Sequence, residues 1–172
     1  EGGCVLATTV WYQRCTNARK AADCLANASE RTKGRRSMIP STFDYVRPKT
    51  VDEAVAALKQ GGDDSKVITG GQSMLPLLRM RLASPSILVD CGRIDEMKGI
   101  KETGDSITIG AATTHHAVLT NDLVNKYAKL LSLATATVAD PQVRHRGTFG
   151  GALAHGDPAG DLPAVALVLN AT

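Results

Sequence analysis

The stretch VITGGQSMLPLLRMRL, residues 67–82, places two adjacent glycines between a short β-branched run and an apolar helical pattern. A tight turn from a strand end into a helix start exposes backbone N–H groups, which together with the positive end of the helix dipole attract phosphate. Gly70 and Gly71 permit positive φ and close backbone approach. Gln72 and Ser73 add side-chain hydrogen-bonding groups. The segment therefore fits a phosphate-binding turn, although taken alone it fits an ordinary turn equally well.

A second glycine-rich stretch, residues 144–163, favours phosphate binding over an ordinary turn. It carries five glycines between Gly147 and Gly160, with Thr148 among them and Asp161 opening a final helical pattern. Neither stretch has the Gly-Lys-Ser/Thr ending of a Walker loop or the GxGxxG of a Rossmann unit. If the two stretches converge, they can hold the two phosphates of a dinucleotide. Asp161 can then bind a ribityl or ribose hydroxyl, or it can cap its own helix.

Residues 38–100 alternate between strand and helix patterns. A capping box, Thr50 with Glu53, begins a helix that ends at Gly61 and Gly62. Strands separated by helical crossovers predict a small parallel sheet covered by helices. The predicted strands lie within residues 40–50, 65–69 and 86–92, and the predicted helices lie within residues 50–62 and 73–82.

The pattern changes at residue 101, and we expect a second subdomain over residues 101–172, with a mixed or antiparallel sheet and helices. Residues 101–119 alternate around a Gly-Asp turn like a hairpin, and residues 121–139 are helical in pattern. The final helical pattern is still apolar where the chain stops, so we expect a fragment of a longer protein. Residues 1–37 have weak periodicity, and we expect a flexible N-terminal extension there.

Composition argues against several function classes. A formal net charge of +3 spread through the chain, with few aromatic residues, does not favour nucleic acid as a partner. No run approaches the roughly 18 apolar residues of a membrane helix, and no secretion signal is recognisable. Four cysteines without a CxxC pair favour reduced thiols over a zinc or iron–sulfur site. His115 and His116 would point apart on a strand, so no metal site is predicted.

Several motifs, taken in order, resemble the FAD-binding medium subunit of the molybdenum hydroxylases, the family of the carbon monoxide dehydrogenase medium chain and the xanthine dehydrogenase FAD domain. They are MIPSTFDYVRPKT, TGGQSMLP with LRMRL, TIGAATTH, and ADPQVRHRGTFGGALAHGDPAGDLPA, and the resemblance covers residues 38–172. It implies an α+β, PCMH-type fold distinct from the Rossmann fold. Two α/β subdomains, residues 38–100 and 101–172, would hold FAD between them, and the family's C-terminal domain would be absent.

The resemblance also implies which residues bind FAD. The first diphosphate contact falls on Thr69, Gly70, Gly71, Gln72, Ser73 and Met74, and the second falls on Thr148, Phe149, Gly150, Gly151 and Ala152. Asp161 matches the family's carboxylate, and the stretch from Val138 to Gln142 would lie near the isoalloxazine ring. Phe149 replaces the usual Ile. Ala152 stands where many members have Asn, which removes one side-chain hydrogen-bonding group.

The function implied by the resemblance is that of an electron-transfer subunit with no catalytic residue or metal ligand of its own. Its implied partners are a large molybdopterin-binding subunit and a small subunit with two [2Fe-2S] clusters, from which electrons pass through FAD to an external acceptor. The implied location is the cytoplasm, including the inner face of the membrane through partners. Alternatives are a stand-alone FAD oxidoreductase and a flavin-free assembly module. Carbon monoxide, an aldehyde and a purine-like heterocycle all remain open as substrates.

Overall fold

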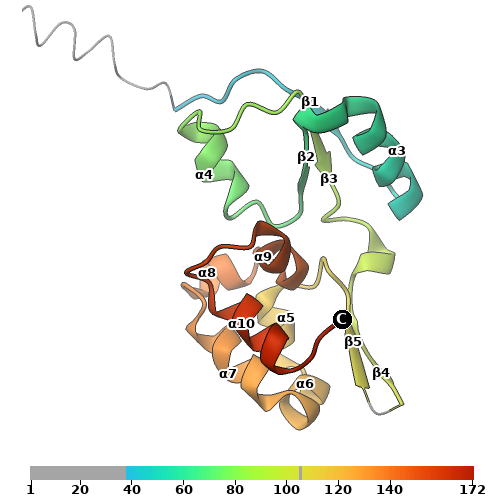
Figure 1. The fold of residues 1–172 in the computed structure, drawn as a ribbon, viewed down its shortest axis with the longest axis vertical. Helices are drawn as coiled ribbons and strands as arrows, with labels where there is room; N and C mark the ends of the chain where they lie inside the picture. Colours follow the sequence, from blue (N-terminus) through green and yellow to red (C-terminus); the bar gives the residue numbers. More distant parts are fainter. Residues whose placement is uncertain (1–37, 105) are drawn as a thin grey trace, which may run out of the picture. The chain divides into compact units, whose positions relative to one another are not determined.

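The structure is a computed structural model that describes residues 38–104 and 106–172. The expected flexible extension over residues 1–37, with three of the four cysteines, lies outside the described residues. Residues 38–172 form one compact unit. Figure 1 shows its elements in chain order, with a parallel sheet in the first half and a hairpin with most of the helices in the second.

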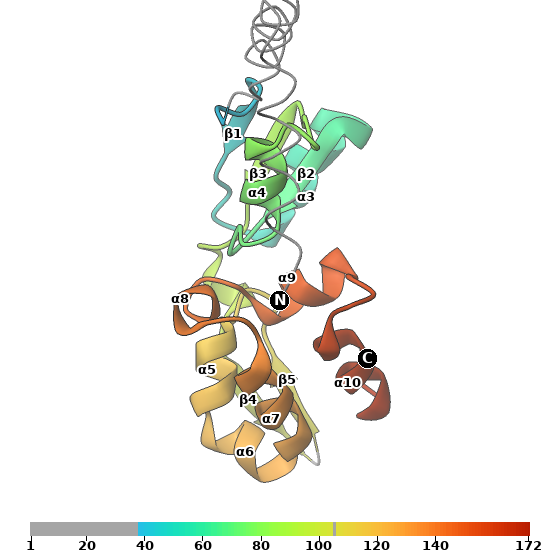
Figure 2. The ribbon, with the colours of Figure 1, turned by 90° about the vertical axis from the view of Figure 1, so that its left-hand side faces the viewer.

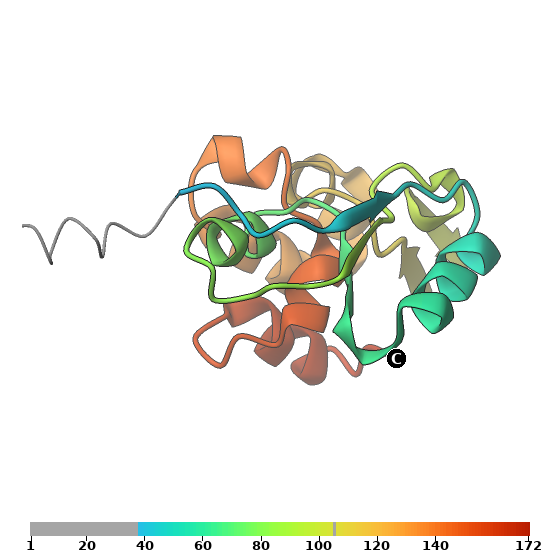
Figure 3. The ribbon, with the colours of Figure 1, turned by 90° about the horizontal axis from the view of Figure 1, so that it is seen from above.

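The first half is the predicted parallel sheet. Its strands are β1 (Asp44–Val46), β2 (Ser65–Ile68) and β3 (Ile87–Asp90), in the order β1-β3-β2, and both neighbouring pairs are parallel. Helix α3 (Val51–Gly61) connects β1 to β2, and helix α4 (Met74–Arg79) connects β2 back to the central strand. Right-handed crossovers that run in opposite directions place their helices on opposite faces of a sheet. Figure 3 shows α3 and α4 on opposite sides of the strands.

Helix α3 begins at the predicted capping box. The Oγ1 atom of Thr50 accepts a hydrogen bond from the N–H of Glu53 at 3.2 Å. The Glu53 carboxylate reaches back to the N–H of Lys49 at 2.7 Å, one residue earlier than in a standard box. The helix ends at Gly61, and Gly62 follows with φ of 61°. These two glycines end the helix as predicted.

Replacing Thr50 with alanine should lower the free energy of unfolding by about 1 kcal/mol, because the first turn of α3 loses its side-chain acceptor. Chemical denaturation of the two proteins measures the difference. The Thr50→Ser variant keeps the hydroxyl and serves as the matched control, with stability close to that of the unchanged chain. Equal stability of the alanine and serine variants would contradict the capping role.

A small hydrophobic core lies between α3 and the sheet. It contains Ala54, Val89, Cys91 and Ile94, each at most 5% exposed. Cys91 is buried in this core as a small apolar residue. Burial is the main cause that raises the pKa of its thiol, and the nearby Asp90 carboxylate raises this pKa further.

The second half joins a hairpin to helices. Strands β4 (Ile100–Thr103) and β5 (Ser106–Ile109) form the predicted antiparallel pair. The helices are α5 (His115–Thr120), α6 (Asp122–Tyr127), α7 (Lys129–Thr137), α8 (Pro141–Arg144), α9 (Phe149–His155) and α10 (Asp161–Val168). Figure 2 shows α5, α6 and α7 close to the hairpin. Val118, Val124, Ala128, Leu131 and Leu162 form the buried core of this half.

The helical pattern over residues 121–139 is confirmed, although it forms two helices, because Ala128 interrupts it with φ of −135° and ψ of 52°. Alanine is a strong helix former, so the intrinsic propensity of Ala128 does not explain the break. The Asn125 side chain spans it, since its Nδ2 donates to Asn121 O and its Oδ1 accepts from Ser132 Oγ. One expectation for this half is wrong. His115 and His116 lie on helix α5 instead of a strand, since Thr114 caps this helix through the N–H of Ala117.

Candidate functional site

The turn between β2 and α4 has the predicted geometry. Gly71 has φ of 74°, in the region that favours glycine, and its carbonyl accepts a hydrogen bond from Leu75 N–H. The backbone N–H groups of residues 71–73 donate no hydrogen bond to any described residue. The Ser73 side chain makes no capping bond to α4. Several donors of this turn are therefore available to an anionic ligand.

The second glycine-rich stretch differs in part from the expectation. The glycines suggest an irregular loop, but residues Phe149–His155 form helix α9, and Thr148 is its N-cap. The Oγ1 atom of Thr148 accepts from the N–H of Gly151 at 3.3 Å, so this N–H already has a partner. The alternative that Asp161 caps its own helix is wrong. Gly160 occupies the cap position of α10 without a side-chain bond, and Asp161 is the first helical residue.

The two glycine-rich segments meet, which is the condition for one shared binding site. The hydroxyl groups of Thr69 and Thr148 are hydrogen-bonded at 2.7 Å, although 79 residues separate them in the chain. A Cβ atom on Gly70 would lie 2.1 Å from the carbonyl oxygen of Arg146 and 2.8 Å from the Cα of Gly147. Only glycine at position 70 allows this backbone approach.

A cavity of about 380 Å³ lies where the segments meet. Nine of the fourteen predicted FAD-binding residues line it, and these are Thr69, Gly70, Gly71, Gln72, Ser73, Met74, Thr148, Gly151 and Ala152. The volume lies within the range typical of small-molecule pockets. The structure thus brings both predicted diphosphate contacts to one cavity, with glycines and hydrogen-bond donors in its wall.

The other five predicted residues lie outside the lining of this cavity. Phe149 and Val138 pack against the hydrophobic core of the second half. Gly150 lies against Ala111, because a Cβ atom on it would be 2.5 Å from the Ala111 Cβ. Gln142 and Asp161 are exposed. The wall formed by the described residues therefore matches the predicted diphosphate end of the site more closely than its ring or sugar ends.

Several cavity residues were not predicted. His115, Gly147 and Lys66 line the cavity together with the predicted set. His155 also lines it, and its place in the second glycine-rich stretch is consistent with an approach to a flavin. Backbone pairing brings His115 there, because its N–H donates to Gly147 O at 2.9 Å and Thr114 forms an antiparallel bridge with Thr148. His115 is 4% exposed, and burial lowers the pKa of its imidazole. No local sequence pattern signals this contact, because Gly147 lies 32 positions later in the chain.

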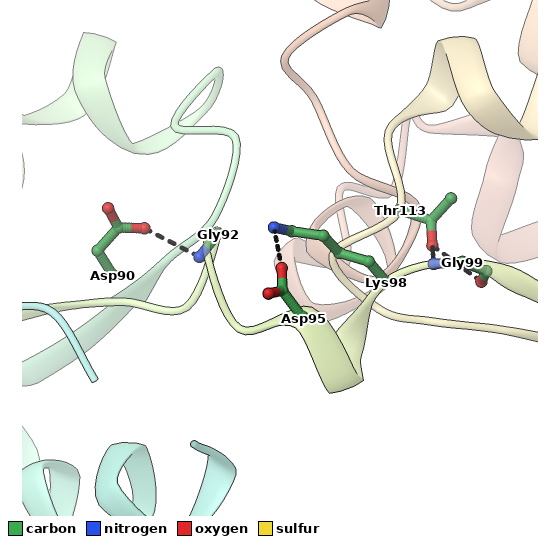
Figure 4. Close-up of polar contacts among 6 residues, drawn as sticks. All are labelled: Asp90, Gly92, Asp95, Lys98, Gly99 and Thr113. Carbon is green, nitrogen blue, oxygen red and sulfur yellow. Dashed lines mark hydrogen bonds and ion pairs between the residues drawn. The ribbon is translucent and has the colours of Figure 1, made fainter. Parts of the chain in front are cut away.

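A larger cavity of about 570 Å³ adjoins the first and shares Thr69, Gly70 and Thr148 with it. Its cationic side chains include Arg47, Arg93, Lys98 and Arg146. Figure 4 shows part of its wall, where the β3–β4 connection is held by polar contacts. The Asp90 carboxylate accepts a hydrogen bond from Gly92 N–H at 2.9 Å, and Lys98 forms an ion pair with Asp95 at 3.1 Å. The Thr113 hydroxyl accepts a hydrogen bond from the N–H of Gly99 and donates one to its carbonyl oxygen.

Two polar side chains that do not line the smaller cavity, those of Arg144 and Tyr45, have hydrogen-bond partners of their own. Arg144 donates from Nη1 to the carbonyls of Ala136, Val138 and Ala139, so it ties α8 to the end of α7. The hydrogen bond that Tyr45 donates to Asp90 is the main cause that raises the pKa of the tyrosine hydroxyl. Within the described residues, no group of three or more His, Cys, Asp or Glu could hold a metal ion.

The wall of the smaller cavity suits a diphosphate. Phosphate oxygens only accept hydrogen bonds, and this wall offers the N–H groups of residues 71–73, the Gln72 amide and the Ser73 hydroxyl. Gly70 and Gly151 leave room where side chains would fill the space between the segments. The fold and this cavity define an α+β domain, built on a plan other than the Rossmann fold, with a small-molecule cavity between two glycine-rich segments.

Comparison with known proteins identifies the family. Residues 41–172 match the model of the FAD binding domain in molybdopterin dehydrogenase, and the chain belongs to this family. The carbon monoxide dehydrogenase medium chain of Hydrogenophaga pseudoflava is 46% identical over 134 residues, which are 78% of this chain and 47% of the relative. The 6-hydroxypseudooxynicotine dehydrogenase complex subunit alpha of Paenarthrobacter nicotinovorans is also 46% identical, over 78% of this chain and 45% of that subunit.

Solved structures agree with this family. Carbon monoxide dehydrogenase from Hydrogenophaga pseudoflava, in a form lacking the Mo-pyranopterin moiety of the molybdenum cofactor, matches with a TM-score of 0.73 and 47% identity, over 74% of this chain and 45% of that one. Quinoline 2-oxidoreductase from Pseudomonas putida 86 matches with a TM-score of 0.69 and 38% identity. The match covers 72% of this chain and 43% of that chain. The chain thus spans about half the length of the relatives it matches.

Proposed function

We propose that this chain binds FAD and serves as the electron-transfer part of a molybdenum hydroxylase complex of the carbon monoxide dehydrogenase type. The observation that carries the proposal is the meeting of the two glycine-rich segments at one cavity, through the Thr69–Thr148 hydrogen bond. Membership of the FAD-binding family supports FAD as the dinucleotide. Bound FAD would supply the redox chemistry, accepting electrons from iron–sulfur clusters and passing them to an external acceptor.

The residues of this chain would bind and position the flavin. The N–H groups of residues 71–73, with the side chains of Gln72 and Ser73, would donate hydrogen bonds to the diphosphate. Residues 148–152 would close the other side of the cavity. The stretch from Val138 to Gln142 would lie near the isoalloxazine ring, and the exposed Asp161 carboxylate would bind a ribityl or ribose hydroxyl.

The proposed partners are a large molybdopterin-binding subunit and a small iron–sulfur subunit. The support is that several relatives are themselves medium chains or subunits of dehydrogenase complexes. Among the described residues, no helix has the length and apolar character needed to cross a membrane. The substrate would be selected on the large subunit, so its identity does not follow from the residues of this chain.

The visible absorption spectrum of the purified chain tests the proposal. After incubation with FAD and desalting, we expect flavin absorption bands to remain with the protein at close to one FAD per chain. The alternative of a flavin-free assembly module predicts a colourless protein after desalting. Failure to retain FAD, even when a large excess is added before desalting, would contradict the proposed function.

A further inference from the structure

His115 is the one buried side chain in the wall of the smaller cavity that carries an unpaired polar nitrogen. Among the described residues, its Nδ1 is the only buried side-chain nitrogen or oxygen without a hydrogen-bond partner. The residue is 4% exposed and lines the cavity together with Gly70, Gly71, Thr148 and Gly151. A buried polar atom without a partner is uncommon in a native structure, and here it constrains where the imidazole carries its proton.

Backbone contacts fix the position of His115. Its N–H donates to Gly147 O at 2.9 Å, and two residues earlier Thr113 O accepts from Phe149 N–H at 2.9 Å. Thr114, between them, bridges to Thr148 and caps α5. The His115 backbone therefore belongs to the same contact that brings the second glycine-rich segment to the cavity.

The orientation of the ring follows from Gly147. A Cβ atom on this glycine would lie 2.9 Å from Cδ2 and 3.2 Å from Nε2 of His115. The Cδ2–Nε2 edge of the imidazole thus lies against the glycine backbone that borders the cavity. A side chain at position 147 would occupy this space, which explains why glycine is needed next to the histidine.

The buried environment selects the proton position of His115. Desolvation disfavours the charged imidazolium, which lowers the pKa and leaves a neutral ring at pH 7. A neutral imidazole has one N–H donor and one acceptor nitrogen. An N–H at the enclosed Nδ1 would have no acceptor, and a buried unpaired donor is costly. The tautomer with the proton on Nε2 avoids that cost.

We propose that His115 is a flavin-binding residue, whose Nε2–H donates a hydrogen bond to a diphosphate oxygen of FAD in the smaller cavity. This inference rests on the proposed function. It adds a side-chain donor from α5 to the cavity whose wall also contains residues 69–74. A neutral donor suits this place, because it binds an anionic oxygen without the desolvation cost of a buried charge.

Leucine and glutamine variants of the full chain test this role. His115→Leu removes the donor, and we expect FAD to bind about tenfold more weakly, as for the loss of one hydrogen bond to a charged group. His115→Gln can place an amide N–H near the position of Nε2, and we expect binding within about threefold of the unchanged chain. Titration of each protein with FAD, followed by flavin fluorescence, gives the dissociation constants.

His116→Gln is the matched control. His116 is the next residue on α5, but it does not line the smaller cavity. Its ring stacks on that of His145, with the ring centroids 3.9 Å apart. We expect this variant to bind FAD like the unchanged chain. Equal loss of affinity in the His116 and His115 variants would overturn the proposal, because it would indicate a general effect on α5.

Nitrogen-15 NMR of the unchanged chain gives a readout that does not depend on a variant's folding. We expect the His115 imidazole to carry its proton on Nε2, and we expect that Nε2 resonance to shift when FAD is added. A proton on Nδ1, or an Nε2 resonance unmoved by bound FAD, would overturn the role of His115 alone. Absence of FAD binding by the unchanged chain would overturn the proposed function and this inference together.

Discussion

Gly70→Val should abolish FAD retention and should lower the free energy of unfolding by roughly 3 kcal/mol or more. The first atom of any side chain at this position would lie 2.1 Å from the Arg146 carbonyl oxygen and 2.8 Å from the Gly147 Cα. Both neighbours are backbone atoms, so neither can rotate away. The two glycine-rich segments must then separate, which breaks the Thr69–Thr148 hydrogen bond and opens the cavity.

Gly151→Val should have a smaller effect on stability than Gly70→Val. A Cβ atom on Gly151 would lie 2.5 Å from Thr148 Oγ1 and 3.0 Å from Thr69 Oγ1, which belong to side chains that can rotate. Such rotation would still disturb the hydroxyl pair in the cavity wall, so FAD binding should weaken. Combining both valines should leave no detectable FAD after desalting.

Gly104→Asn is the matched control for these glycine substitutions. Gly104 has φ of 61°, and a Cβ atom there would meet no atom within 4 Å. Asparagine tolerates this backbone region, so the hairpin variant should keep both stability and FAD binding. Chemical denaturation and the flavin absorption spectrum measure the two effects. Retention of FAD by Gly70→Val would show that the meeting of the segments does not form the binding site.

The first half of the fold could be predicted because its signals are local. Strand and helix patterns alternate at short intervals, and a capping residue and two glycines mark the ends of α3. The parallel sheet then follows from the helical crossovers. The positive φ of Gly71 and the close approach at Gly70 were also predictable, since both depend on the absence of a Cβ atom.

The second half was harder to predict because contacts between distant residues decide it. The break at Ala128 has no local signal, because alanine is a strong helix former. Thr114 did signal the start of α5, but strand-like alternation in the preceding residues obscured it. The role of His115 in the cavity wall depends on pairing with Gly147, 32 positions later, which no local pattern reveals.

Thr148→Val is the second substitution with a large expected effect, because the Thr148 hydroxyl has two partners. It accepts from Gly151 N–H as the cap of α9, and it shares a hydrogen bond with Thr69 at 2.7 Å. The side chain is buried, with 6% exposed. Loss of a cap and of a part-buried hydrogen bond should lower the free energy of unfolding by about 1–3 kcal/mol. FAD should bind about tenfold or more weakly, since each 1.4 kcal/mol corresponds to a factor of ten.

A double-mutant cycle separates the two roles of Thr148. Thr69→Val removes the shared hydrogen bond but leaves the cap of α9, so it should destabilise the chain less than Thr148→Val while still weakening FAD binding. If the shared bond links the segments, the double variant should be more stable than the sum of the single losses predicts, by about 1 kcal/mol. Thr148→Ser keeps the hydroxyl and should retain FAD. Strict additivity of the two valine substitutions would mean that the hydroxyl pair does not couple the segments, and that the backbone approach at Gly70 alone holds the cavity together.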